Sequence, residues 1–298
     1  MSNRIVRLSQ HAPATPVFET LTGLNAAQAA GFTSLVFCDD FDDPATIDFS
    51  ATGKAGCHWY LDNPYGMEPF KPSDLTVKNS VLTFAPEKCH CGLFSYSKKG
   101  DTGFSWHYGY AEAKIRLKAS YIVSHANGRK GWPSFWGISL NDVRGKPWEP
   151  AGEIDIMEAF MVNDADNEGG AYYCGAVHDH HRLPEGGKEV ATNTCNAIGH
   201  HGDSRLFDDD WHTYGVLWKE NYLAWYIDGR FHHAVEYGQN QLPVYRVWNS
   251  DTPLEVAEGP RNRVGAFSIL DTDRLTLVIG GDIRWPCEVD WVRVWGTP

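Results

Sequence analysis

The 298-residue sequence predicts an all-β protein built as a two-sheet antiparallel β-sandwich. Short segments in which apolar and polar residues alternate recur along the chain, as expected for strands with one buried face. Turn residues separate these segments, and no long helical pattern or internal repeat interrupts them. Many short strands joined by turns are typical of sandwich architectures.

The composition is rich in aromatic residues and acidic overall. Aromatic residues make up 13% of the chain and include 12 Trp, a residue that serves both as core and as a stacking platform for sugar rings. The net charge of −12 gives no basic stripe for phosphates, which argues against a nucleic-acid partner. It also disfavours a sulfated polysaccharide, which would bind a cationic groove.

No apolar stretch approaches the roughly 20 residues of a membrane span, so no membrane partner is expected. The first ten residues are not followed by an apolar segment, and no signal peptide is visible. The sequence therefore leaves the location open, although the expected function points outside the cell or to the periplasm. The seven cysteines are an odd number spread along the chain, which leaves at least one unpaired.

We expect residues 1–31 to form an N-terminal extension packed on the surface, with a short helix at 25–31 that ends at a glycine. Residues 32–298 are expected to form a single domain. Its first strands are predicted at 35–38, which looks buried, and at 75–84, which alternates.

Residues 105–117 give the clearest amphipathic strand, because Glu112, Lys114 and Arg116 alternate with apolar residues. Two long polar stretches, 179–210 and 239–263, are expected to be irregular. The remaining strands are predicted at 132–140, at the acid-rich segment 152–158 that follows a loop at 141–151, and at 170–178, the pair within 211–229, 230–235, 275–279 and 289–295. We expect His200, His201, His232 and His233 to lie at the surface.

Residues 152–158 carry three carboxylates at close spacing, Glu153, Asp155 and Glu158. Side chains alternate between the two faces of a strand, so the first two share a face and the third should point the other way. A β-bulge at Ile156–Met157 would return Glu158 to the same face, and would avoid burying a charge in the core.

Three acids on one face repel one another and drive their pKa values apart, so that one can act as a nucleophile while another donates a proton. Cleavage of a glycosidic bond uses such a pair. The alternative is an edge strand with a solvated acidic face. The interleaved large apolar residues and the aromatic flanks favour the catalytic interpretation, but the strand alone leaves the roles of the two glutamates interchangeable.

These residues resemble the signature of glycoside hydrolase family 16, in the bulged form typical of laminarinase-like members, agarases and carrageenases. The resemblance extends over residues 32–298. Further segments match in the order of the family: 38–42, 109–115, 131–136, 211–214, 225–229 and 289–295.

The resemblance implies a jelly roll whose concave sheet forms the substrate cleft, and a retaining mechanism. Glu153 would be the nucleophile and Glu158 the acid/base, while Asp155 would hydrogen-bond one of them. No cofactor is needed for this catalysis. A structural calcium is expected at Asp290, where a hydrogen-bonded or exposed aspartate is the alternative.

Four further residues are predicted to bind substrate. Trp132 and Trp136 share a face at strand spacing and would stack on sugar rings, unless they belong to the core. Trp148, in the loop before Glu153, would be a third platform. The resemblance places His178 near the acid/base.

We therefore expect a monomeric endo-glycosidase that cleaves internal β-linkages of a polysaccharide, with β-1,3- or mixed β-1,3-1,4-glucan first. The alternatives are a hydrolase of galactans (agar or carrageenan type), or of a bacterial exopolysaccharide such as succinoglycan, and a non-catalytic glycan-recognition protein. The intact acids disfavour the last of these.

Overall fold

The structure of the chain is a computed structural model. It describes the following residues: 5–7, 17–61, 69–84, 91–117, 132–145, 151–160, 172–180, 182–185, 188–191, 209–238, 241–247, 255–257, 273–282 and 287–297.

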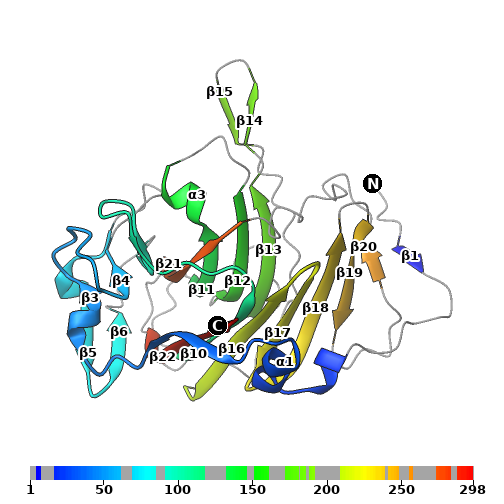
Figure 1. The fold of residues 1–298 in the computed structure, drawn as a ribbon, viewed down its shortest axis with the longest axis horizontal. Coiled ribbons are helices and arrows are strands. Elements are labelled where there is room, and N and C mark those ends of the chain that lie inside the picture. Colours follow the sequence, from blue (N-terminus) through cyan, green and yellow to red (C-terminus); the bar gives the residue numbers. More distant parts are fainter. Residues whose placement is uncertain are drawn as a thin grey trace.

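Two large β-sheets form the body of the molecule, as predicted (Figure 1). The nine-stranded sheet has the order β19 (Gln241–Val247), β18 (Arg230–Gly238), β17 (Tyr222–Ile227), β16 (Trp211–Lys219), β10 (Gly109–Leu117), β22 (Cys287–Gly296), β6 (Val81–Phe84), β5 (Leu75–Lys78), with β2 (Ser34–Asp39) paired to β22. The seven-stranded sheet has the order β13 (Tyr172–His180), β12 (Ala151–Phe160), β11 (Trp132–Ser139), β21 (Leu275–Asp282), β7 (Cys91–Phe94), β4 (Trp59–Tyr60), β3 (Ile47–Asp48). All neighbours in both sheets are antiparallel except β3 and β4.

Smaller elements surround the sheets. Three two-stranded pairs are β1 (Ile5–Arg7) with β20 (Glu255–Ala257), β8 (Tyr96–Ser97) with β9 (Thr102–Gly103), and β14 (Arg182–Glu185) with β15 (Lys188–Ala191), the last projecting at the top of Figure 1. The helices are η1 (Val17–Thr20), α1 (Gly23–Ala29), η2 (Pro44–Thr46), η3 (Pro72–Asp74) and α3 (Leu140–Val143). None of the helices in the described part of the chain is long and apolar enough to cross a membrane.

The main core lies between the two sheets, where alternate residues of both are apolar. In β10 the residues Ala111, Ala113 and Ile115 are fully buried in this core, while the charged residues between them are half-buried on the other face. The predicted amphipathic strand is therefore confirmed. Each large side chain that is removed from water here contributes roughly 1.5–3 kcal/mol.

The N-terminal segment packs on the opposite face of the nine-stranded sheet. Thr22 caps α1, whose residues Ala26 and Ala27 are buried against Tyr110 and Tyr226. The helix begins two residues earlier than predicted and is followed by Gly31 in the left-handed region at φ 89°. The division into an extension and one domain stays a prediction, but the described part of the extension covers apolar surface of the sandwich.

Three predictions of secondary structure were wrong in detail. Residues 75–84 form a hairpin, because Asn79 and Ser80 adopt positive φ and reverse the chain. The supposedly irregular stretch 239–263 contains β19 and β20. The supposedly polar, irregular stretch 179–210 contains the β14–β15 hairpin.

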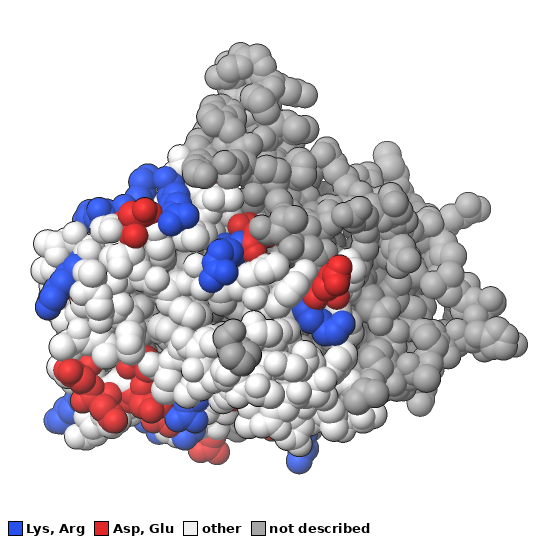
Figure 2. All heavy atoms as spheres, in the orientation of Figure 1, with Lys and Arg blue, Asp and Glu red and all other residues white. Residues whose placement is uncertain are grey.

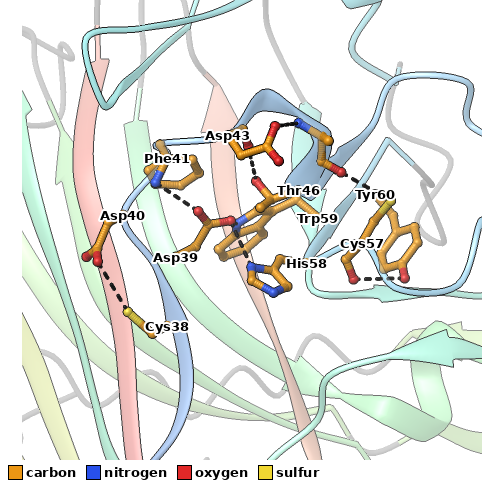
Figure 3. A network of polar contacts seen from close by, with 11 residues as sticks. Cys38, Asp39, Asp40, Phe41, Asp43, Thr46, Cys57, His58, Trp59 and Tyr60 are labelled. Carbon is orange, nitrogen blue, oxygen red and sulfur yellow. Dashed lines mark hydrogen bonds and ion pairs between the residues drawn. The ribbon is translucent and has the colours of Figure 1, made fainter.

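Strand β2 is less buried than predicted, with Leu35 52% exposed, because it pairs only with β22 within the described chain. Its last residue, Asp39, is buried and accepts hydrogen bonds from the Phe41 amide at 2.8 Å and the Trp59 indole at 3.0 Å (Figure 3). His58 Nδ1 lies 3.1 Å from the same carboxylate. This network fixes the turn after β2 against the core.

Charged side chains on the surface are mixed in sign. On the face drawn in Figure 2, several Lys and Arg side chains of the described residues lie next to Asp and Glu side chains, while others stand alone. Ion pairs at the surface include Arg144 with Asp101 at 3.0 Å and Arg293 with Asp40 at 2.9 Å.

Candidate active site

The acidic strand β12 contains the predicted β-bulge. Against β11, Asp155 pairs with Trp136 and Met157 pairs with Phe135, so the register skips Ile156. Against β13, the register shifts between Asp155 and Glu158. One extra residue therefore lies between the second and third acids, at the position that the sequence predicted.

Burial shows which way the bulged residues point. Ile154, Ile156 and Met157 are all fully buried in the core between the sheets, so two consecutive residues face inward. Glu153 and Glu158 are half-buried, and Asp155 is 2% exposed. The inward pair restores the alternation after it, and all three acids occupy the outward face of the seven-stranded sheet.

The three acids of β12 have register partners in both adjacent strands, and those in β11 are all apolar or uncharged. Across β11 they pair with Ile138, Trp136 and Ser134 in turn. Ile138 and Trp136 belong to a small apolar cluster on this face, together with Leu140 and Val143 of α3. Across β13 the same acids pair with His178, Ala176 and Cys174. None of these six register partners is a lysine or arginine.

Of the predicted substrate-binding residues, the structure places the side chain of Trp136 on this face. Trp136 pairs with Asp155 and is 7% exposed, so little of its ring reaches solvent. Trp132 lies in the same strand opposite Asp282, and its side chain is outside the described residues. Trp148 is also outside them. Sugar stacking by all three stays a prediction.

His178 lies in β13, the strand after the acidic one, as expected. Its register partner is Glu153 rather than Glu158, which pairs with Cys174. The backbone thus places His178 next to the predicted nucleophile and four residues along β13 from the partner of the predicted acid/base.

Two contacts behind the acids escaped the sequence analysis. Trp225 of the opposite sheet donates its indole N–H to the Asp155 carbonyl at 2.8 Å. His233, expected at the surface, is 3% exposed and stacks on Trp225 with ring centroids 4.3 Å apart. Gly175 lies beside both, and an isolated glycine within a strand was a signal of close approach.

Asp273 supports the start of the acidic strand. Its carboxylate accepts a hydrogen bond from the Gly152 amide at 3.4 Å and from the Arg274 amide at 2.8 Å. Burial raises the pKa of the Asp273 carboxyl, and these hydrogen bonds act in the opposite direction. No pattern in the sequence connects Asp273 with Gly152, so the sequence analysis did not find this contact.

The surroundings of Asp290 do not fit a calcium site. Its Oδ2 lies 2.7 Å from Lys114 Nζ, so an ammonium group already neutralises the carboxylate. Within the described segments, no group of three His, Cys, Asp or Glu residues could hold a metal ion. Structural calcium stays a prediction that this arrangement does not favour.

Carboxylates grouped on one face are what a glycoside hydrolase needs, because it cleaves the glycosidic bond with a pair of acids. The sequence profile of glycosyl hydrolases family 16 matches residues 69–260. The chain belongs to this family, which confirms the resemblance noted in the sequence and the predicted jelly roll.

Relatives of known name match the same region. Glucan endo-1,3-beta-glucosidase A1 of Niallia circulans is 26% identical over 196 residues, which is 61% of this chain and 25% of that protein. A beta-glucanase of Acetivibrio thermocellus is 28% identical over 177 residues, 59% of this chain and 42% of that protein. The match thus spans less than half of either relative.

Solved structures resemble the chain at lower identity. The laminarinase catalytic domain from Thermotoga maritima aligns with a TM-score of 0.45 and 18% identity, over 89% of this chain and 98% of that one. Porphyranase B from Zobellia galactanivorans aligns with a TM-score of 0.49 and 16% identity, over 88% and 92%.

Proposed function

We propose that the chain is a retaining endo-glycosidase that hydrolyses internal β-linkages of β-1,3-glucan or mixed β-1,3-1,4-glucan. The observation that carries this proposal is the bulge in β12, which leaves Glu153, Asp155 and Glu158 on one face. Membership of the family and the glucanase names of the relatives support the choice of reaction and substrate.

The proposed reaction is a double displacement. Glu153 attacks the anomeric carbon while Glu158 donates its proton to the leaving glycosidic oxygen, and a glycosyl–enzyme ester forms. Glu158, now a carboxylate, removes a proton from an incoming water, which displaces Glu153 and releases the sugar. This geometry requires the two carboxyl groups to lie about 5–5.5 Å apart.

Asp155 lies between the two glutamates in the strand and is 2% exposed. Its role in the proposal is to hydrogen-bond one of them and to influence which of the three acids holds the proton. Like charges held close together cannot all ionise easily, so the trio keeps one proton available for the leaving group.

Glu153→Gln tests the nucleophile, and Glu158→Gln tests the acid/base. Hydrolysis of polysaccharide should collapse in both, while binding persists. On an aryl glycoside whose leaving group needs no proton, Glu158→Gln should retain far more of the first step than Glu153→Gln. Equal losses on both kinds of substrate would contradict the division of roles.

The substrate is tested by measuring reducing-sugar release from laminarin, lichenan, agar, carrageenan and succinoglycan, followed by linkage analysis of the products. The proposal expects laminarin or lichenan to be cleaved fastest. Preferential cleavage of agar, carrageenan or succinoglycan would replace the substrate class but keep the mechanism. Binding without cleavage of any of them would indicate a recognition protein.

A further inference from the structure

The bulge that groups the three acids is held from behind by a contact between the two sheets. A regular antiparallel ladder directs each carbonyl along the sheet to a neighbouring strand. The Asp155 carbonyl, directly before the skipped Ile156, accepts a hydrogen bond from outside its own sheet: Trp225 Nε1 of the opposite sheet donates to it at 2.8 Å. The indole thus bonds the backbone where the ladder of β12 is interrupted.

The surroundings are shaped to let the indole reach this carbonyl. Gly175 of β13 lies between Ala176 and Cys174, which pair with Asp155 and Glu158 on the two sides of the bulge. A Cβ atom at Gly175 would lie 2.5 Å from Trp225 Cδ1 and 2.7 Å from its Nε1. Any other residue would therefore displace the ring from its hydrogen bond.

The other side of the indole is also fixed. His233 stacks on Trp225 with an interplanar angle of 7°, and a Cβ at Gly175 would come within 3.0 Å of this imidazole as well. The β17–β18 register shifts next to this pair, so β18 carries an irregularity of its own behind the acidic strand. Trp225 is fully buried and has no exposed surface for substrate.

We propose that Trp225 is a positioning residue, which holds the Asp155 carbonyl at the bulge and thereby sets the separation of the outward carboxylates of Glu153 and Glu158. Gly175 provides the space that this contact requires. The inference rests on the proposed hydrolase function for its kinetic consequence, but the contact itself is testable without any substrate.

The matched pair of variants is Trp225→Phe and Trp218→Phe. Both tryptophans are fully buried in the same core on adjacent strands, and both substitutions remove the same ring atoms. The Trp218 N–H has no hydrogen-bond partner among the described residues, so its substitution removes packing alone. Replacing Trp225 with 3-benzothienylalanine keeps the ring shape and removes only the donor.

Hydrogen exchange of the peptide that covers residues 151–160 tests the contact. We expect exchange at the bulge to be about ten-fold faster or more in Trp225→Phe and in the benzothienyl variant than in Trp218→Phe. Equal protection in Trp225→Phe and Trp218→Phe would overturn the inference, as would wild-type protection in the benzothienyl variant.

Kinetics test the positioning role. Because misplacement of catalytic groups by about 1 Å reduces the chemical step strongly, kcat should fall about 10- to 100-fold in Trp225→Phe with KM nearly unchanged. The limbs of its pH–rate profile should also shift. In Trp218→Phe, kcat and the profile should stay near wild type, and a kcat loss equal to that of Trp225→Phe would overturn the inference.

Gly175→Ala gives an independent variant that alters neither the tryptophan nor the acids. Its kcat should fall like that of Trp225→Phe, but adding it to Trp225→Phe should cost little more, since the hydrogen bond that it disturbs is already absent. Full additivity would contradict the inference. A wild-type chain that cleaves none of the polysaccharides would overturn the proposed function, while the exchange comparison would still decide whether Trp225 holds the bulge.

Discussion

Strands β12 and β22 each carry a β-bulge beside an acid, and these two bulges point in opposite directions. In β12 the doubled pair is Ile156 and Met157, both buried between the sheets. In β22 the register against β10 skips Asp290, so Asp290 and Trp291 are consecutive residues that are both half-exposed on the outer face. An inward bulge keeps charges on the outward face, whereas an outward bulge adds a charge to it.

The register partners around the two bulges differ in charge. Beside β22, Asp290 pairs with Lys114 at 2.7 Å, and Arg116 Nε pairs with Glu288 at 2.6 Å. The acids of β12 have no lysine or arginine among their register partners in β11 and β13. The same backbone device therefore lies on an ion-paired surface in one sheet and among the candidate catalytic acids in the other.

The largest expected effect distinguishes glutamates on the two surfaces. Glu153→Gln or Glu158→Gln should reduce hydrolysis by about a thousand-fold, because each removes a group that acts in the transition state. Glu112→Gln makes the same change on the outward face of β10 and should leave the rate unchanged. Comparable losses at residues 112 and 153, measured on the best polysaccharide, would remove the functional distinction between the two surfaces.

The direction of the β12 bulge can be tested by changing the length of the strand. Inserting one alanine between Ile156 and Met157 should turn Glu158 toward the core, abolish activity and destabilise the fold by about 3–5 kcal/mol. Deleting Ile156 should preserve the pairing of Phe135 with Met157 and keep all three acids outward.

Denaturant unfolding and rate measurements on both length variants make the comparison. The deletion should retain more activity and stability than the insertion, because only the insertion buries a charge. The opposite order would show that the alternation of side chains does not control the placement of Glu158.

A smaller effect is expected on the pH dependence of the free energy of unfolding, and it comes from Glu112 on the ion-paired surface. Burial raises the pKa of the half-buried Glu112 carboxyl, although the Tyr110 hydroxyl donates a hydrogen bond to it at 2.8 Å. The folded protein then keeps a proton that the unfolded chain has lost, so stability falls as the pH rises from the ordinary glutamate pKa through the raised one.

Glu112→Gln should remove this contribution and flatten the decline in urea midpoint over that pH window. Glu220→Gln, at an exposed turn, provides the surface control and should leave the profile unchanged. An unaltered decline in Glu112→Gln would show that this carboxyl is not its source.

The smallest effect is expected at the Lys114–Asp290 pair. Both side chains are about one-third exposed, so Lys114→Met should change the free energy of unfolding by less than about 1 kcal/mol and leave activity intact. Calcium or a chelator should not move the melting temperature of the wild type. A rise with calcium that disappears in Asp290→Asn would instead establish the structural calcium predicted from the sequence.

The sequence was sufficient for the parts of the fold and site that follow from local alternation. The inward and outward residues of β10 and the position of the β12 bulge both follow from that pattern. The acids of residues 153–158 were found because charge on a core face is costly enough to demand a bulge.

Contacts between distant segments could not be found in this way. Trp225, Gly175 and Asp273 meet the acidic strand only because the two sheets pack and β21 runs alongside β11. His233 appeared to be a surface residue because a histidine next to another histidine carries no sign of stacking on a tryptophan. Residues 75–84 appeared to be one strand because their alternation continues across the turn.

The most direct test of the central claim is to identify the residue that becomes covalently glycosylated. Glu158→Gln should be treated with a 2-deoxy-2-fluoro glycosyl fluoride of the preferred sugar, whose leaving group needs no acid, and its peptides should be mapped by mass spectrometry. The account predicts a single glycosyl adduct on Glu153. An adduct on another residue would contradict it, as would turnover of the fluoride with inversion at the anomeric carbon.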